Sequence, residues 1–473
     1  MTPGALVIEG CAIATMDGAH PGATGAEYRG GHIVVADDGR IAAVGDGPAV
    51  VGAASRNDGC RVVDGTGCLA TPGLINTHHH LYQWLTQGMA QQAPLFDWLT
   101  ELYPVWARID AEQVHAAATA GLAWLALSGC STSTDHHYIF PASHPGALEA
   151  EIHAAAGVGL RFHPGRGSMD LGRSAGGLPP DDIVEDIDAA LAATEDAIRR
   201  FHDPSPGSML RIAVAPCSPF SATARLMREA AELARRTGVR LHTHLAETRE
   251  EDAYCRQSLG RTPAEYADDL GWLGPDVWLA HCVHLDEPAT KRLAVTGTSV
   301  AHCPSSNARL GSGIAPVRQL LRAGAGVGLG VDGPASSEAS TVAGELRQAM
   351  LTARLRGDDG PTALSARQAL WLGTRGGARC LGREDQIGAL RPGMLADIAL
   401  WRLDTLAYDA AAYGDAASPD PVAALMGGPA PLELLLVGGK PVVERGELRT
   451  ADVTAATLNV RLARKRLFAE AER

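Results

Sequence analysis

The sequence lacks the features that mark secreted, membrane-spanning and disulfide-stabilised proteins. It has nine cysteines but no C-x-x-C pair, and scattered thiols of this kind are typical of a reducing compartment. No apolar run approaches the roughly 20 residues that a membrane span needs. The N-terminus, MTPGALVIEGCAIATMDG, has no basic segment followed by a long apolar one, as a signal peptide would have. We therefore expect a soluble, cytoplasmic protein.

Positive charge is also scarce, since 41 lysines and arginines stand against 54 aspartates and glutamates, for a formal net charge of −13. A protein that binds nucleic acid through its phosphates needs a basic face, and so does a protein that docks on an anionic membrane. The sequence therefore predicts no nucleic-acid partner and no membrane partner. It favours a small-molecule substrate held by local groups.

Short β-like runs with glycine turns occupy both ends of the chain. GHIVVADDGRIAAVG, with DDGR as a turn candidate, is typical of a hairpin, and GALRPGMLADIALW and LELLLVGGKPVVERGEL near the other end look similar. Neither end has enough strands for its own core. We predict that residues 1–69 and 389–455 form one small β domain together. Residues 456–473 are expected to form a terminal surface helix.

The middle, residues 70–388, alternates short apolar runs with amphipathic stretches. Eight strand candidates are LATPGLINTHHH, CSTSTDHH, LRFHPGRG, LRIAVAPCSP, VRLHTHLAE, VWLAHC, TSVAHCPSS and GVGLGVDG. This pattern predicts an α/β fold and favours a (β/α)₈ barrel, a TIM barrel. A doubly wound open sheet alternates in the same way, so the alternation alone leaves both open.

Polar side chains follow the strand candidates where a parallel barrel has its active site. They are His78, His80, His244, His281 and Asp332. Histidine and carboxylate ligands without thiolates suit Zn²⁺, and iron or manganese less strictly. A metal with an open position lowers the pKa of a bound water and supplies hydroxide. Asp332 can take up a proton in such a site, and Glu247 can hand one to the substrate.

The run His78–His79–His80 has a simple interpretation in a strand. Alternate side chains share a face, so His78 and His80 can bind one metal while His79 points away toward the helix layer. His242 competes with His244 for the same reason, and we favour His244 because it lies nearer the end of its strand.

Other histidines have a structural interpretation. His284 is a weaker candidate than His281 because it lies in the loop beyond the strand. The remaining histidines at or near strand candidates are expected to be hydrogen-bonded structural groups: His136, His137, His163 and His302.

The strings TPGLINTHHH, LHTHLAET, AHCVHL and GLGVDG, in this order, resemble the amidohydrolase superfamily in its cytosine-deaminase-like and triazine-hydrolase-like branch. The resemblance implies a TIM barrel with a composite β-sandwich, one Zn²⁺ per chain (with iron possible), and a homo-oligomer. It places the metal on four ligands: His78, His80, His244 and Asp332. It also implies that His281 contacts the nucleophilic water, that Glu247 protonates a ring nitrogen, and that Asp332 moves a proton from the water to the leaving amine.

Finer strings such as NTHHHLYQ, WLTELYPVWARI, RGSMDLG and HCPSSNARLGSGIAP resemble 8-oxoguanine deaminases. The implied reaction is attack of metal-bound hydroxide on the amino-bearing carbon of an oxidised purine, which turns 8-oxoguanine into urate and ammonia. Hydroxylated s-triazine aminohydrolases and pterin (isoxanthopterin) deaminases have overlapping patterns and are the alternatives. A non-catalytic scaffold is a third, against which the presence of every predicted ligand argues.

Two side chains are candidates for contacts with the substrate. Gln83 offers an amide donor and acceptor for a purine-like edge. Arg166 either holds a substrate oxygen or is a surface or ion-paired arginine. The sequence departs from the family pattern after Asp332, where it reads GPASSEAS. We expect Pro334–Glu338 to change the loop beside the metal.

Overall fold

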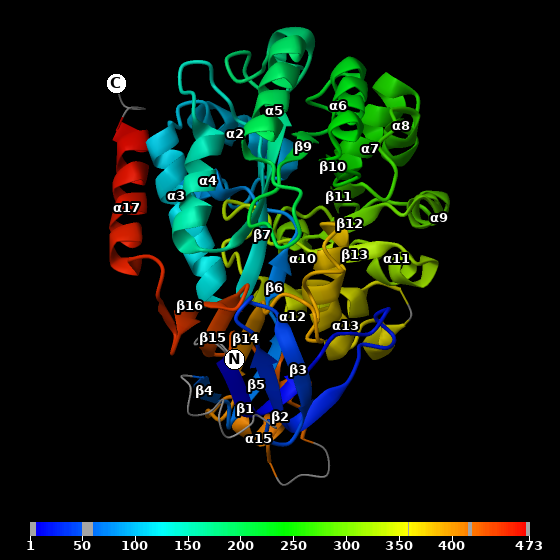
Figure 1. Ribbon diagram of the computed structural model, residues 1–473. Coiled ribbons are helices and arrows are strands. Elements are labelled where there is room, and N and C mark those ends of the chain that lie inside the picture. Colours follow the sequence, from blue (N-terminus) through cyan, green and yellow to red (C-terminus); the bar gives the residue numbers. More distant parts are fainter. Residues whose placement is uncertain (1–5, 50–59, 358, 415–418, 470–473) are drawn as a thin grey trace.

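The computed structural model describes residues 6–49, 60–357, 359–414 and 419–469 (Figure 1). Residues 1–5 and 50–59 of the predicted β domain and residues 470–473 of the predicted terminal helix lie outside the described residues. A closed barrel surrounded by helices forms the larger body, and a sheet built from both chain ends lies beneath it in Figure 1.

The barrel confirms the predicted TIM fold and decides against the open sheet. Its strands are β6 (Leu74–Asn76), β7 (Cys130–His137), β8 (Arg161–Ser168), β9 (Ala213–Pro216), β10 (Arg240–Leu245), β11 (Val277–His281), β12 (Ser299–His302) and β13 (Gly326–Leu329). All neighbouring strands are parallel, and β13 closes the barrel onto β6 through the pairing of Leu329 with Asn76. Parallel strands need crossover connections, and the helices between the strands supply them.

The helices begin and end where local sequence signals place them. Asp110 and Gln113 form a reciprocal capping box at the start of α3, and Gly238, with φ of 74°, ends α6. The helices of the described chain are α2 (Leu95–Trp106), α3 (Ala111–Leu127), α4 (Ala147–Val158), α5 (Ile187–Phe201), α6 (Ala224–Thr237), α7 (Arg249–Tyr254), α8 (Pro263–Asp269), α9 (Glu287–Thr296), α10 (Pro304–Arg309), α11 (Val317–Ala323), α12 (Val342–Leu355), α13 (Ala366–Trp371), α14 (Gly377–Cys380), α15 (Asp409–Ala412), α16 (Pro421–Leu425) and α17 (Val453–Ala469). None of these described helices is both long and apolar enough to cross a bilayer.

The second body is one sheet of nine strands assembled from both ends of the chain. Its strands are β1 (Leu6–Ala14), β2 (Glu27–Val35), β3 (Ile41–Asp46), β4 (Arg61–Asp64), β5 (Cys68–Pro72), β14 (Ile398–Arg402), β15 (Leu432–Val437), β16 (Lys440–Glu444) and β17 (Glu447–Leu448). The two ends join where β14 pairs antiparallel with β5. These strands surround one apolar cluster, and a separate β domain built from both chain ends is confirmed.

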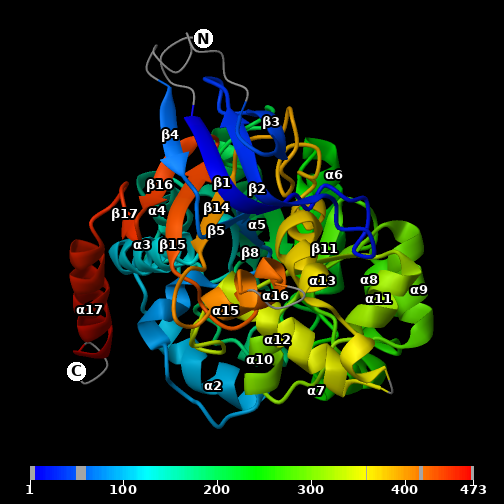
Figure 2. The ribbon, with the colours of Figure 1, turned by 90° about the horizontal axis from the view of Figure 1, so that it is seen from below.

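The sheet is fixed to the barrel by a buried ion pair. Arg161, at the start of β8, lies 3.1 Å from Asp397, which precedes β14. Helix α17 begins at Val453, a few residues before the predicted start, and packs beside α3, as the view from below also shows (Figure 2). The domain limits at residues 69 and 388 stay a prediction.

Candidate active site

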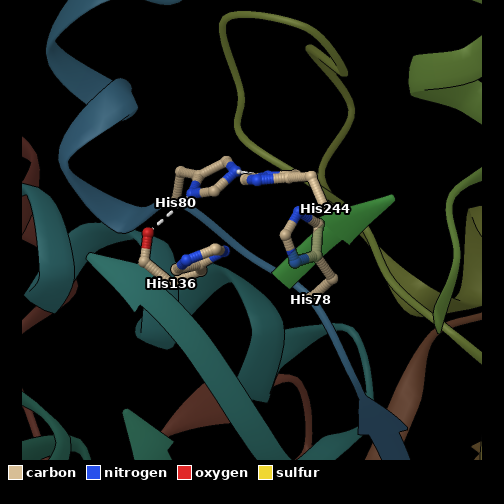
Figure 3. Close-up of side chains that lie close together, drawn as sticks. All are labelled: His78, His80, His136 and His244. Carbon is tan, nitrogen blue, oxygen red and sulfur yellow. Dashed lines mark hydrogen bonds between the residues drawn. The ribbon is translucent and has the colours of Figure 1, made fainter. Parts of the chain in front are cut away.

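The four predicted metal ligands meet at the carboxyl-terminal end of the barrel, although they come from distant parts of the chain. His78 and His80 follow β6, His244 lies in β10, and Asp332 follows β13. The Nε2 atoms of His80 and His244 lie 3.1 Å apart, and Asp332 Oδ1 lies 3.4 Å from His78 Nε2 and 3.3 Å from His80 Nε2. All four side chains are buried, and Figure 3 shows the three imidazoles turned toward one another.

Backbone carbonyls fix the tautomers of His80 and His244. His80 Nδ1 lies 2.7 Å from the carbonyl oxygen of His136, and His244 Nδ1 lies 2.6 Å from that of Cys217. A carbonyl can only accept, so each Nδ1 carries the hydrogen and each Nε2 presents a lone pair. The 3.1 Å contact between the two Nε2 atoms therefore places two lone pairs face to face.

His78 has the same tautomer through a relay. His242 Nδ1 donates to the carbonyl oxygen of Trp278 at 2.8 Å, so His242 Nε2 is an acceptor. It lies 2.8 Å from His78 Nδ1, which must donate to it. The remaining nitrogen of His78, Nε2, is buried without a hydrogen-bond partner among the described residues. His242 thus orients a predicted ligand in place of competing with His244.

Three lone pairs and a carboxylate oxygen that converge with no proton between them fit a cation. Ligand atoms of a tetrahedral site with metal–ligand distances of 2.0–2.1 Å lie about 3.3 Å apart, close to the separations found here. Burial lowers the pKa of His80 to about 4 and holds the pKa values of His78 and His244 well below the usual range. The imidazoles are therefore neutral near pH 7, as metal ligands must be. The donor set fits a divalent metal ion.

His136 is brought into the same cluster, where the sequence had favoured a structural role. Its side chain, with those of His78, His80 and His244, could hold a metal ion (Figure 3). His136 Nε2 donates to the carbonyl oxygen of Ala215 at 2.8 Å, and its Nδ1 is buried without a partner in the described chain. The alternation of β7, which turns every second side chain into the barrel, was the signal that could have found it.

A neighbouring acidic group on the outer face of β7 is not suited to a metal. His137 Nε2 donates to the carbonyl oxygen of Ile139 at 2.8 Å, and its Nδ1 lies 2.5 Å from Glu151 Oε1. Both ring nitrogens are therefore engaged, and the short contact leaves no room for an ion. Asp135 of this group accepts a hydrogen bond from the backbone N–H of Leu81, which holds the segment after His80 in place.

The predicted acid–base groups lie beside the ligand cluster. His281 Nε2 lies 3.7 Å from Glu247 Oε2 and 3.9 Å from Asp332 Oδ2, while its Nδ1 donates to Asn307 Oδ1 at 2.9 Å. Burial raises the pKa of Glu247 to about 7, against the opposing effect of His281. Burial lowers the pKa of His281, but the carboxylates of Glu247 and Asp332 outweigh it, so this pKa lies above its usual value.

The backbone is strained where the strands deliver these groups. Non-glycine residues with positive φ include Ala246 (53°), His281 (69°), Cys282 (50°) and Asp332 (59°). Such conformations cost on the order of 1–3 kcal/mol each and persist only where surrounding contacts enforce them. Glu251 enforces one of them, because its carboxylate accepts from the backbone N–H groups of Ala246 and Glu247, each at 2.8 Å.

A cavity opens above the cluster. Its polar wall includes the predicted residues His80, Gln83, His244, Glu247, His281 and Asp332. Its apolar wall includes side chains that the sequence reasoning missed: Leu95, Trp98, Leu99, Tyr103, Phe220 and Leu310. Several of them lie on α2, which approaches the barrel mouth from outside and therefore carries no strand-end signal.

Gln83 and Arg166, the two predicted substrate contacts, differ in placement. Gln83 lines the cavity, and both its Oε1 and its Nε2 are buried without a hydrogen-bond partner among the described residues. Arg166 is not among the lining residues; it forms two 2.6 Å contacts with Glu185 and lies 4.0 Å over the ring of Phe140. This favours the alternative of an ion-paired arginine.

The loop after Asp332 fastens one wall of the cavity. The carbonyl oxygen of Ala335 accepts from Trp98 Nε1 at 3.3 Å. Glu338 pairs with Arg309 at 3.2 Å, and its carbonyl oxygen accepts from Gln87 Nε2 at 2.7 Å. The segment Pro334–Glu338 therefore holds α2 over the site through Trp98, and its Ser336 hydroxyl donates to the predicted ligand Asp332 at 3.1 Å.

Comparison with known proteins agrees with this geometry. The chain is 45% identical to an 8-oxoguanine deaminase of Pseudomonas aeruginosa over 94% of this chain and 97% of the relative. It is 40% identical to an isoxanthopterin deaminase from an unknown prokaryotic organism over 78% and 80% of the two chains. Among solved structures, an atrazine chlorohydrolase from Arthrobacter aurescens TC1 complexed with zinc superposes with a TM-score of 0.87 at 32% identity, covering 97% of this chain and 100% of that one.

The family model described as the amidohydrolase family matches residues 69–442, which is most of the chain and includes every predicted ligand. With the closed barrel and the histidine–aspartate cluster at its carboxyl-terminal end, this match makes the chain a member of the amidohydrolase family.

Proposed function

We propose that the protein is a zinc-dependent deaminase that converts 8-oxoguanine to urate and ammonia. The observation that carries the proposal is the position of Glu247, a carboxyl group with a pKa of about 7, beside a converging set of histidine lone pairs in one cavity. The choice of 8-oxoguanine rests on the 45% identity to a deaminase of that substrate.

His78, His80, His244 and Asp332 are the residues that would hold the zinc ion. A bound zinc ion lowers the pKa of a water molecule toward neutrality and so supplies a nucleophile. His242 keeps the lone pair of His78 directed at the site, and the carbonyl groups of His136 and Cys217 do the same for His80 and His244. These contacts support the ligand set and fix its geometry before a substrate enters.

The proton steps follow from the side chains at the cavity. Asp332 Oδ2 accepts from the hydroxyls of Ser306 (2.5 Å) and Ser336 (3.1 Å), which favours the ionised carboxylate and suits it to take a proton from the attacking water. Glu247 is poised to donate its proton to a ring nitrogen, since its pKa lies near neutrality. The proton held on Asp332 then passes to the amine. The second proton of the water returns to Glu247 as the new carbonyl forms, so one water is consumed, one ammonia leaves, and the ring gains an oxygen in place of its amino group.

The cavity supports a flat, polar substrate. Its apolar wall offers aromatic faces for a planar ring, and Gln83 offers one acceptor and one donor that no described residue engages. A purine-like edge with a neighbouring carbonyl and N–H would satisfy both atoms of that amide.

A pterin or a hydroxylated s-triazine is the alternative substrate. Both are flat rings of similar polarity, and the similarity to an isoxanthopterin deaminase and the fold shared with an atrazine chlorohydrolase favour keeping them.

We further propose that the enzyme acts in the cytoplasm as a homo-oligomer. All nine cysteines are free thiols, which supports a reducing compartment. Light scattering behind a sizing column measures the oligomeric state, and a monomer at micromolar concentration would contradict that part.

A substrate panel on zinc-loaded protein tests the main proposal. It comprises 8-oxoguanine, guanine, isoxanthopterin and hydroxyatrazine, with release of ammonia or amine as the measurement and urate identified by its absorbance. We expect 8-oxoguanine to have the highest kcat/KM. Turnover of a pterin or a triazine without urate formation from 8-oxoguanine would replace the proposed substrate, and no turnover of any compound would refute the deaminase.

A further inference from the structure

A second pocket lies at the opposite, amino-terminal end of the barrel, where β8, β9, β10 and β11 begin. Its volume is ≈ 240 Å³, and its polar lining consists of Arg211, Arg240, His163, His202 and Trp278. We call these five residues the arginine pocket. None of the described lining residues is acidic, although the whole chain has a formal net charge of −13.

Arg240 is the central feature of the arginine pocket. Its Nε and Nη2 atoms are both buried, and neither has a hydrogen-bond partner in the described parts of the chain. Within 4.0 Å, no described carboxylate forms an ion pair with Arg240 or Arg211. A guanidinium stays protonated at any ordinary pH, and burying it without a partner is costly. Charged N–H groups in this position point to a ligand that accepts hydrogen bonds.

The two histidines of the arginine pocket add donors, whereas Arg211 already donates to Ser208 Oγ (3.2 Å) and to the carbonyl oxygens of Pro204 (3.2 Å) and Ser205 (3.3 Å). Arg383 Nη1 donates to His163 Nε2 at 3.2 Å, so the hydrogen of neutral His163 lies on Nδ1. The backbone N–H of Ile212 donates to His202 Nδ1 at 3.2 Å, so His202 carries its hydrogen on Nε2. Each histidine that lines the arginine pocket is thus left with an N–H to offer.

The carboxylates near the arginine pocket either pair with another arginine or lie too far from Arg211 and Arg240 to form an ion pair. Asp397 is taken up by Arg161 through contacts of 3.1–3.4 Å. Asp203 and Asp385 raise the pKa of Arg211, and Glu384 and Asp276 raise that of Arg240, but burial is the larger effect and lowers both. No carboxylate of the described chain therefore contacts Arg211 or Arg240 directly, and the aromatic ring beside Arg240 is that of Trp278, whose centroid lies 5.9 Å from Arg240 Cζ.

We propose that the arginine pocket binds an oxyanion of the phosphate class, either free phosphate or the phosphate group of a monoester. Phosphate presents several acceptor oxygens in different directions, which matches the unpartnered N–H groups of Arg240 and the N–H groups of the two histidines, while Arg211 adds a second positive charge. A chloride ion has no such directional acceptors, and a neutral ligand leaves the buried charge of Arg240 uncompensated.

The arginine pocket shares a wall with the metal cluster. Arg240, His242 and His244 are alternate residues of β10 and so lie on one face of that strand. Trp278, which lines the arginine pocket, stacks on His242 with ring centroids 4.4 Å apart at an angle of 17°, and His242 in turn receives the hydrogen bond of His78. The two sites are thus opposite ends of one continuous row of side chains.

Titration calorimetry on the full-length, zinc-loaded protein tests the proposal without reference to catalysis. Sodium phosphate is titrated at constant ionic strength, with sodium chloride as the reference titrant. We expect saturable binding of one phosphate per chain. The variant Arg240→Met keeps the aliphatic stem and loses the guanidinium, and it should bind phosphate at least about tenfold more weakly, since a hydrogen bond to a charged group contributes that much or more.

Arg211→Gln, at a partly exposed position, should also weaken binding and serves if Arg240→Met folds poorly. Arg236→Met removes an exposed arginine of α6 that pairs with Glu195 and should bind phosphate as the unaltered protein does. Binding of AMP and ribose 5-phosphate, compared with phosphate, identifies whether the natural ligand is a nucleotide, a sugar phosphate or the free ion. The proposal is overturned if phosphate binds no better than chloride, or if both pocket variants bind it as tightly as Arg236→Met.

Discussion

The two ends of the barrel carry opposite imbalances in hydrogen bonding. At the carboxyl-terminal end, His80 and His244 face each other with lone pairs, and the carboxylate of Asp332 adds a third acceptor. At the amino-terminal end, Nε and Nη2 of Arg240 have no acceptor among the described residues, and His163 and His202 add further N–H groups. The predicted metal ligands are buried, as are Nε and Nη2 of Arg240, so water does not easily compensate these atoms.

The difference shows how one strand can serve two binding sites of opposite charge. In β10 the inward positions run from Arg240 through His242 to His244, from a surplus of donors to a surplus of acceptors. His242 stands between them as both a donor, to Trp278, and an acceptor, from His78. A cation suits the first end and an anion the second.

The largest effect is expected from removing a lone pair at the carboxyl-terminal end. His80→Gln should lower the zinc content from about one equivalent to nearly none, because a site with three protein nitrogens loses one of them, and deamination should be lost with it. Elemental analysis of protein purified without chelators measures the content. His79→Gln is the matched control, since His79 is also buried but belongs to none of the candidate metal-binding groups. If His79→Gln lost zinc and His80→Gln kept it, the assignment of His78 and His80 to the metal-binding face of the strand would be wrong.

Glu247→Gln should separate proton transfer from metal binding at the same end. The amide keeps the shape but cannot donate a carboxyl proton, so kcat should fall by about 10²–10⁴-fold while zinc content stays unchanged. Steady-state kinetics and metal analysis on one preparation provide both values. Glu250→Gln, at an exposed position of α7, should leave kcat unaltered. If Glu247→Gln retained full activity, the general acid would have to be another group.

Loss of a charge should affect stability differently at Arg161, which pairs with Asp397, and at Arg240, which has no carboxylate partner among the described residues. Asp397→Asn leaves Arg161 buried without its countercharge and should reduce the free energy of unfolding by about 3–5 kcal/mol. Arg240→Met removes a charge that already lacks a partner, so its melting temperature in phosphate-free buffer should not fall. Calorimetric melting of the two variants compares them, and equal destabilisation by both would mean that Arg240 is compensated after all.

The smallest effect is expected at His242, between the two ends. His242→Asn should weaken zinc binding by about 10–100-fold, as is usual for a group that orients a ligand without touching the metal. Competition with a zinc-sensitive dye measures the affinity. An unchanged affinity would show that His78 is held by other contacts.

The sequence predicted which side chains of a strand point into the barrel, because successive side chains of a β-strand point to opposite faces. The separation of His78 and His80 from His79, and the convergence of His244, His281 and Asp332, follow from that alternation and from the parallel arrangement of the barrel. The joining of both chain ends into one sheet was predictable from the shortage of strands at each end.

Features that depend on packing between distant segments were not predictable. Trp98 reaches the cavity because the loop after Asp332 holds α2 over the barrel mouth, and no local pattern encodes that contact. The arginine pocket likewise brings Arg383 to His163, residues far apart in the chain, and nothing in the surroundings of either residue in the sequence marks it as part of a site.

Anomalous X-ray diffraction from crystals of the zinc-loaded protein, with data collected on both sides of the zinc edge, tests the central claim most directly. We expect one strong peak per chain between the Nε2 atoms of His78, His80 and His244 and the Oδ1 atom of Asp332. A peak at Asp135, His137 and Glu151, or none at the barrel mouth in protein that deaminates its substrate, would contradict the account.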